Sequence, residues 1–135
     1  MKIPALLIAV YTPVMLLIHV STGKILRAWN EQPDSRISRW FTPRCALRVE
    51  GVFWLLALAA GPLWQSLVLK VLVAVFSAIH FAIWIAGEFR VDWKSDSAFA
   101  TSPTWKRIIV IFDSVEALVL AVLGVVAVSY LIHPG

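Results

Sequence analysis

Four long apolar runs divide the chain, and each is close to the length that a membrane-spanning helix needs. The hydrocarbon core of a bilayer is about 30 Å thick, so an α-helix crosses it in about 20 residues. The runs predict spans at about residues 3–20, 43–61, 66–87 and 104–132. A more polar segment, residues 23–42, follows the first run, and we expect it to lie along the membrane surface. The pattern therefore predicts an all-α, integral membrane four-helix bundle that forms one domain over residues 1–135.

The third run carries two distinct faces. Residues four apart lie on the same side of a helix, and small residues on a membrane helix let a neighbouring helix approach closely. One face of this run is a stripe of alanines: Ala74, Ala78, Ala82 and Ala86. The opposite side carries Val73, Ser77, His80, Trp84 and Gly87. We expect both faces to pack, with His80 directed towards the interior of the bundle.

Composition agrees with a membrane protein. Of the 135 residues, 60% are hydrophobic and only 15% are charged, and the mean hydropathy is +0.83. A soluble domain with these proportions would leave too much apolar surface in contact with water. The single cysteine, Cys45, excludes an internal disulfide framework.

The charges predict how the chain is oriented. Basic residues outnumber acidic ones between Ser21 and Leu47, and such segments normally stay on the cytoplasmic side. This places loops 1 and 3 in the cytoplasm and both termini outside, most plausibly in a bacterial cytoplasmic (inner) membrane. Much of the net charge of +4 lies beside the bilayer, where anionic lipid is the expected partner. The basic character therefore calls for no nucleic-acid partner.

Two helix starts and one extended segment are also predicted in the polar stretches. Asp34 or Ser35 is a candidate cap for a short helix, and Thr42-Pro43 is a typical start for the second span. After the third span, apolar and charged residues alternate over positions 88–94, which favours a short extended segment.

Four ionisable residues lie at membrane depth: Glu50, His80, Asp113 and Glu116. A rise of about 1.5 Å per residue places the last three about 9 to 13 Å from the inner surface, so they can meet in one pocket. An ionised side chain in hydrocarbon costs about 3 kcal/mol or more, so such groups normally face the interior and pair. The cluster fits a proton relay, a cation site or a quinone contact.

A purely structural role for these residues is an equal alternative. In it, His80 bonds Glu116, the acids pair with Arg48, with Arg107 or with another subunit, and the contacts only fix the helix register. The four residues show none of the usual ligand spacings of metal sites, so the sequence predicts no metal centre.

His19 and His80 form a second candidate pair. They lie on different helices at depths that differ by about 5 Å, which suits the two axial ligands of a haem b. An interfacial histidine at the end of the first span is the alternative explanation for His19.

Three short segments resemble the DoxX family of small four-helix membrane proteins and relatives such as MauE. They are LLIHVSTGKIL at the end of the first span, Glu50-Gly51 in the second and AIHF in the third. The chain departs from the family pattern in that Val20 follows His19, where glycine is usual, and in the longer lysine spacing. The resemblance implies an accessory membrane subunit of a quinone-linked or thiol-linked oxidoreductase, with Glu50 and His80 at recurrent polar positions.

The leading functional hypothesis is therefore a small accessory subunit of a larger membrane complex in electron transfer or quinone-linked redox chemistry. Other membrane subunits are its expected partners, and quinone or haem b its candidate cofactors. The buried acids also fit a proton- or ion-coupled transporter. A membrane-embedded enzyme that modifies lipids is a further alternative.

Overall fold

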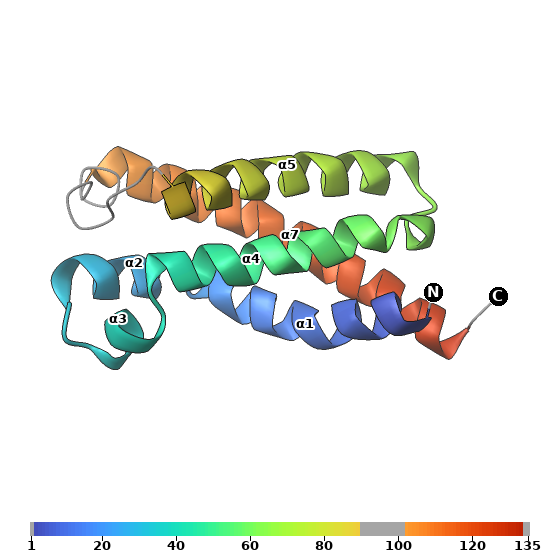
Figure 1. Cartoon of the computed structure of the whole chain (residues 1–135), viewed down its shortest axis with the longest axis horizontal. Coiled ribbons are helices and arrows are strands. Elements are labelled where there is room, and N and C mark those ends of the chain that lie inside the picture. Colours follow the sequence, from blue (N-terminus) through green and yellow to red (C-terminus); the bar gives the residue numbers. More distant parts are fainter. Residues whose placement is uncertain (1, 90–101, 134–135) are drawn as a thin grey trace.

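The structure, a computed structural model, describes residues 2–89 and 102–133, and every regular element in these residues is helical. The prediction of an all-α chain is therefore confirmed for this part of the chain. The elements are α1 (Lys2–Val20), α2 (Thr22–Glu31), α3 (Arg36–Trp40), α4 (Pro43–Ala59), the 3₁₀ turn η1 (Gly61–Leu63), α5 (Leu67–Phe89) and α7 (Pro103–Ile132) (Figure 1).

Three helices are long and apolar enough to cross a membrane: α1, α5 and α7. They agree with three of the four predicted spans. The helix of the remaining span, α4, has 17 residues and carries Arg44, Arg48 and Glu50 in its first half. It is shorter than the other three, and its N-terminal half contributes polar side chains to the contacts described below.

The long helices run side by side, with α1 packed against α7 and α4, and α4 packed against α5 (Figure 1). The start of α1, the end of α7 and the η1 turn lie at one end, whereas α2 and α3 lie at the other. Large side chains that are fully buried fill the space between the helices, among them Ile8, Met15, Phe53, Trp54, Leu120 and Leu123.

The outer surfaces of the helices are also apolar. Leu6, Leu17, Val68, Leu118 and Val125 are all more than half exposed. In water such a surface would be strongly unfavourable, whereas in a bilayer it contacts lipid tails. The burial pattern is thus that of a membrane protein, with a packed interior and an apolar exterior.

Two helices occupy the polar segment after α1. The N-terminal cap of α3 is Ser35, as expected, since its side chain accepts a hydrogen bond from the backbone N–H of Ser38 at 3.2 Å. The sequence analysis did not predict α2, which buries Thr22, Ile25 and Leu26. The indole of Trp29 donates a hydrogen bond to the carbonyl of Phe41 at 2.6 Å and so joins α2 to the chain beyond α3.

At the start of α4, the hydroxyl of Thr42 accepts a hydrogen bond from the N–H of Cys45 at 3.2 Å. The predicted start at Thr42-Pro43 is confirmed. The extended segment predicted after the third span falls almost wholly on residues 90–101, outside the described residues, and α5 itself continues to Phe89.

Among the described residues, only one of the two faces of α5 is covered by other helices. Val73, Ser77 and His80 are buried, as expected, but Ala74, Ala78 and Ala82 are exposed. The described part of the chain therefore covers only the face that carries His80, and packing of the alanine stripe stays a prediction. The close approach to α4 occurs elsewhere, at Gly51, where a side chain would overlap the ring of Trp84.

A second close approach joins α1 to α7. A Cβ atom on Gly124 would lie 2.8 Å from the Cγ2 atom of Thr12, which is tighter than normal van der Waals contact. The two helices therefore pack with almost no side chain between them at this level. This contact fixes the position of α7 relative to α1, and with it the position of Glu116 two turns nearer the α2 end.

Candidate functional site

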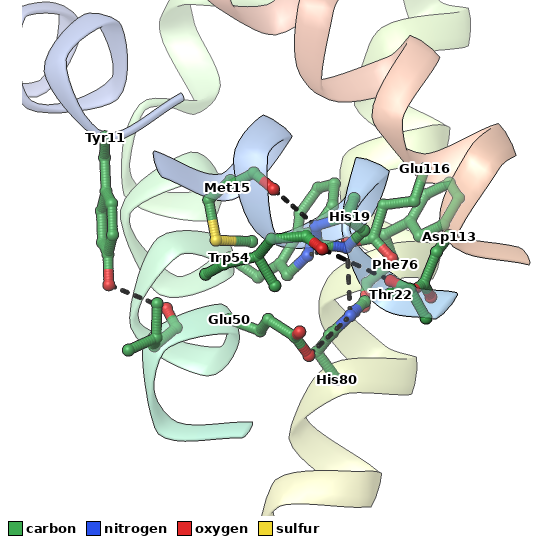
Figure 2. A network of polar contacts seen from close by, with 12 residues as sticks. Tyr11, Met15, His19, Thr22, Glu50, Trp54, Phe76, His80, Asp113 and Glu116 are labelled. Atoms are coloured by element: carbon green, nitrogen blue, oxygen red, sulfur yellow. Dashed lines mark hydrogen bonds and ion pairs between the residues drawn. The ribbon is translucent and has the colours of Figure 1, made fainter. Parts of the chain in front are cut away.

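Three buried side chains from three helices meet in the interior: His19 of α1, His80 of α5 and Glu116 of α7 (Figure 2). The Nε2 atoms of both histidines lie 3.2 Å from the same carboxylate oxygen, Oε1 of Glu116. The side chain of Glu116 is fully buried, and those of His19 and His80 are 1% and 5% exposed. We call these three residues the histidine–glutamate cluster.

Backbone carbonyls fix the orientation of both imidazoles. The Nδ1 atom of His19 lies 2.8 Å from the carbonyl oxygen of Met15, and that of His80 lies 2.8 Å from the carbonyl oxygen of Phe76. A carbonyl oxygen can only accept a hydrogen bond, so each Nδ1 carries a proton. Hydrogen-bond geometry thus assigns the tautomer, and each Nε2 is directed at Glu116.

The two oxygens of Glu116 have different surroundings. The indole N–H of Trp54 donates a hydrogen bond to Oε1 at 2.8 Å, in addition to the two imidazole contacts. Among the described residues, no donor reaches Oε2. The rings of Trp54 and His80 stack with centroids 5.6 Å apart, so the cluster lies against aromatic surface instead of water.

Glu50 of α4 connects the cluster to the outside of the protein. Its Oε2 atom lies 3.7 Å from Nε2 of His80, and its side chain keeps 15% of its exposure. The side chain of Glu50 is therefore more accessible than those of His80 and Glu116.

Asp113 belongs to a different contact. Its carboxylate accepts a short hydrogen bond from the hydroxyl of Thr22, the first residue of α2. Of the four residues proposed from the sequence, the structure brings Glu50, His80 and Glu116 together. It places Asp113 beside α2, where it ties that helix to α7.

The geometry does not fit the haem hypothesis for His19 and His80. A porphyrin would have to lie between the two Nε2 atoms, but Oε1 of Glu116 is 3.2 Å from both of them and leaves no room there for a macrocycle. The two histidines lie close together because the Nε2 atoms of both contact the same carboxylate oxygen.

The contacts of His19 and Trp54 with Glu116 were not predicted from the sequence. Spacing along α1 could have indicated the first, because its buried residues recur every three or four positions up to His19: Ala5, Ile8, Thr12, Met15 and His19. No comparable pattern identifies Trp54, because a buried tryptophan is common in any helical core.

Arg48 does not neutralise the buried acids. Its guanidinium forms a two-pronged contact with Glu88, with nitrogen–oxygen distances of 2.5 and 3.0 Å. This pair lies at the surface between α4 and α5. Within the described residues, the positive charge nearest to Glu116 must therefore come from the histidines or from a bound cation.

The chemistry of the cluster follows from the two tautomers. With Nδ1 protonated, a neutral histidine presents a lone pair at Nε2, and a lone pair facing a carboxylate oxygen at 3.2 Å is repulsive. The contact is attractive only when a proton or another cation lies between the two atoms. The arrangement is therefore suited to binding positive charge in an apolar interior.

Comparison of the chain with protein-family models, with curated protein sequences and with solved structures gives no match.

Proposed function

We propose that the protein is a small integral membrane subunit of a larger redox complex, in which the histidine–glutamate cluster takes up and releases protons. The observation that carries the proposal is the convergence of His19 and His80 on one buried oxygen of Glu116. Ionisable residues in membrane helices commonly form proton relays, and histidine changes charge near neutral pH.

Quinone-linked electron transfer is a process that uses a cluster able to take up and release protons. A quinone that is reduced in the membrane takes up protons together with electrons, and it dissolves in the lipid phase. A group that changes protonation near the quinone supplies those protons without exposing the site to bulk water.

The exposed alanines of α5 support the role as a subunit. Ala74, Ala78 and Ala82 form a smooth stripe on the outside of the described structure. Small residues on a membrane helix allow another helix to pack closely, which large aliphatic side chains would prevent. We therefore place the contact with the partner subunit on this face of α5.

The orientation of the chain is part of the proposal. Four spans, with α4 as the second, leave both termini outside and α2 and α3 on the cytoplasmic side of a bacterial inner membrane. The basic residues of the segment around α2 and α3 favour this orientation and contact anionic lipid.

Labelling with a membrane-impermeant maleimide tests the orientation. In a Cys45→Ser background, Lys24→Cys should react only from the cytoplasmic side, and Gln65→Cys, in the turn before α5, only from the outside. Both positions are exposed, so access to reagent depends on the side of the membrane alone. Labelling of both cysteines from one side would contradict the four-span arrangement.

Native purification tests the function itself. In a mild detergent, the protein should migrate with a complex much larger than the free 15.0 kDa chain. With His80→Phe, the complex should still assemble. Quinone-linked electron transfer should fall at least about tenfold, because proton transfer by a positioned side chain commonly contributes about 100-fold or more to a rate. Migration of the wild type as a free monomer would overturn the subunit role, and unchanged turnover in His80→Phe would overturn the proton role.

A proton- or ion-coupled transporter is the second candidate, favoured by the partial exposure of Glu50 next to a fully buried Glu116. In this case the protein alone, in liposomes, should carry a cation flux that Glu116→Gln abolishes. The redox-subunit proposal expects no flux from the isolated chain.

A further inference from the structure

The histidine–glutamate cluster also has the composition and geometry of a metal site, although the sequence spacing predicts none. We propose that His19, His80 and Glu116 bind a divalent first-row transition-metal cation, and that Glu50 is an additional carboxylate ligand on the more exposed side of the site. This inference depends on the geometry of the cluster and not on the redox role of the protein.

The distances between the candidate ligand atoms fit a small cation. One atom from each of the three residues lies within 4.8 Å of the other two. Each imidazole nitrogen is 3.2 Å from the carboxylate oxygen. In a tetrahedral zinc site with bonds of about 2.0 Å, neighbouring ligand atoms are about 3.3 Å apart.

The surroundings hold the imidazoles in the form that a metal requires. A ligating histidine is normally neutral, and its second nitrogen donates to a backbone carbonyl or a carboxylate, which fixes the ring. The carbonyls of Met15 and Phe76 have this role for His19 and His80. Both Nε2 lone pairs are thereby directed at one point before any cation binds.

Glu116 supplies a second, independent indication. Its carboxylate is fully buried, yet Oε2 has no hydrogen-bond partner among the described residues. An unpaired carboxylate oxygen in an apolar interior is unfavourable, and a cation bound beside this carboxylate offsets part of the cost by its positive charge. Trp54 donates to the other oxygen and keeps the group in place.

The donor set narrows the class of cation. Two imidazoles with one or two carboxylates suit Zn²⁺ and Fe²⁺, whereas Mg²⁺ and Ca²⁺ prefer oxygen ligands alone and Cu⁺ prefers sulfur. Glu50, with 15% of its side chain exposed, is the more accessible of the two carboxylates at the site.

Metal binding to the purified full-length protein tests the proposal. The protein is isolated with an affinity tag that contains no histidine, treated with a chelator and dialysed against Zn²⁺ or Co²⁺. We expect one Zn²⁺ per chain, and with Co²⁺ the intense visible absorption of a tetrahedral site. His19→Gln, His80→Gln and Glu116→Gln should each weaken binding at least about 100-fold, since loss of outer-shell partners alone costs 10- to 100-fold.

His133→Gln is the matched control, because this third histidine lies exposed at the end of α7. It should bind Zn²⁺ as the wild type does, and Glu50→Gln should weaken binding by about tenfold. Binding should also weaken as the pH falls, because protons on His19, His80, Glu116 and Glu50, and to a lesser degree on nearby Asp113, compete with the metal.

Wild-type protein that binds less than one Zn²⁺ per chain would overturn the proposal, even if the cluster variants prove too unstable to purify. Equal binding by the wild type and folded Glu116→Gln would overturn it as well. Neither result depends on whether the protein belongs to a redox complex.

Discussion

Replacing Glu116 with glutamine should lower the free energy of unfolding by about 3–5 kcal/mol, the usual cost of removing one partner from a buried ion pair. The substitution preserves shape but removes the negative charge that both imidazoles contact at 3.2 Å. The positive charge that binds there is then left in an apolar interior. Reversible unfolding in mixed detergent micelles measures the change.

Glu88→Gln is the matched control for this variant. The residue pairs with Arg48, but at the surface, where water screens the interaction and the pair contributes little. We expect a much smaller effect than at Glu116. If the two substitutions lowered stability equally, Glu116 would not be the anion at the centre of a buried cluster.

Replacing all three residues of the cluster by leucine should restore most of the stability that Glu116→Gln loses. Exchange of a buried ionic group for apolar side chains of similar volume is commonly neutral, or stabilising by about 1–4 kcal/mol. The triple variant, His19→Leu, His80→Leu and Glu116→Leu, should therefore fold and assemble. Its quinone-linked turnover should fall about 100-fold or more, because the three groups of the histidine–glutamate cluster that take up protons are gone and Glu50 has lost its histidine partner.

This pair of variants distinguishes a functional site from a structural lock. A stable triple variant without turnover means that the polar residues are retained for function at the expense of stability. A stable triple variant with full turnover would show that the cluster only aligns the helices. A triple variant as unstable as Glu116→Gln would contradict the energetic part of the account.

Much of the fold was predictable, because a long apolar run in a sequence has few alternatives to a membrane helix. Residues 3–20, 66–87 and 104–132 lie within or close to α1, α5 and α7. Thr42 and Ser35 cap helices because a short polar side chain before a helical segment binds the first free N–H groups.

The faces of the helices were less predictable. The alanine stripe of α5 is equally suited to a partner within the chain and to one outside it, and a sequence pattern cannot distinguish the two. The closest approach to α4 occurs instead where Gly51 meets the ring of Trp84, a complementary pair that has no periodicity in the sequence. The helix α2 was not predicted, because the segment contains many polar residues. Its buried side consists of a few residues that include Thr22, Ile25 and Leu26.

The candidate site was predictable in part. Depth in the membrane indicated that His80 and Glu116 can meet, and in the structure they do. Depth alone could not assign partners to Asp113 or His19, because a partner also depends on how each helix is rotated. That rotation is set by close contacts such as Gly124 against Thr12, which appear only when the helices are assembled.

In His19 and in His80, the Nδ1–H group donates a hydrogen bond to a backbone carbonyl, and the Nε2 atoms of both rings contact the same carboxylate. Nitrogen-15 NMR of histidine-labelled, metal-free protein in bilayers measures the protonation and hydrogen bonding of each ring nitrogen directly. We expect both Nδ1 atoms to stay protonated across the pH range, and the Nε2 signals of His19 and His80 both to shift in Glu116→Gln, whereas those of His133 should not. Nε2 signals of His19 and His80 that are unchanged by Glu116→Gln would contradict this arrangement.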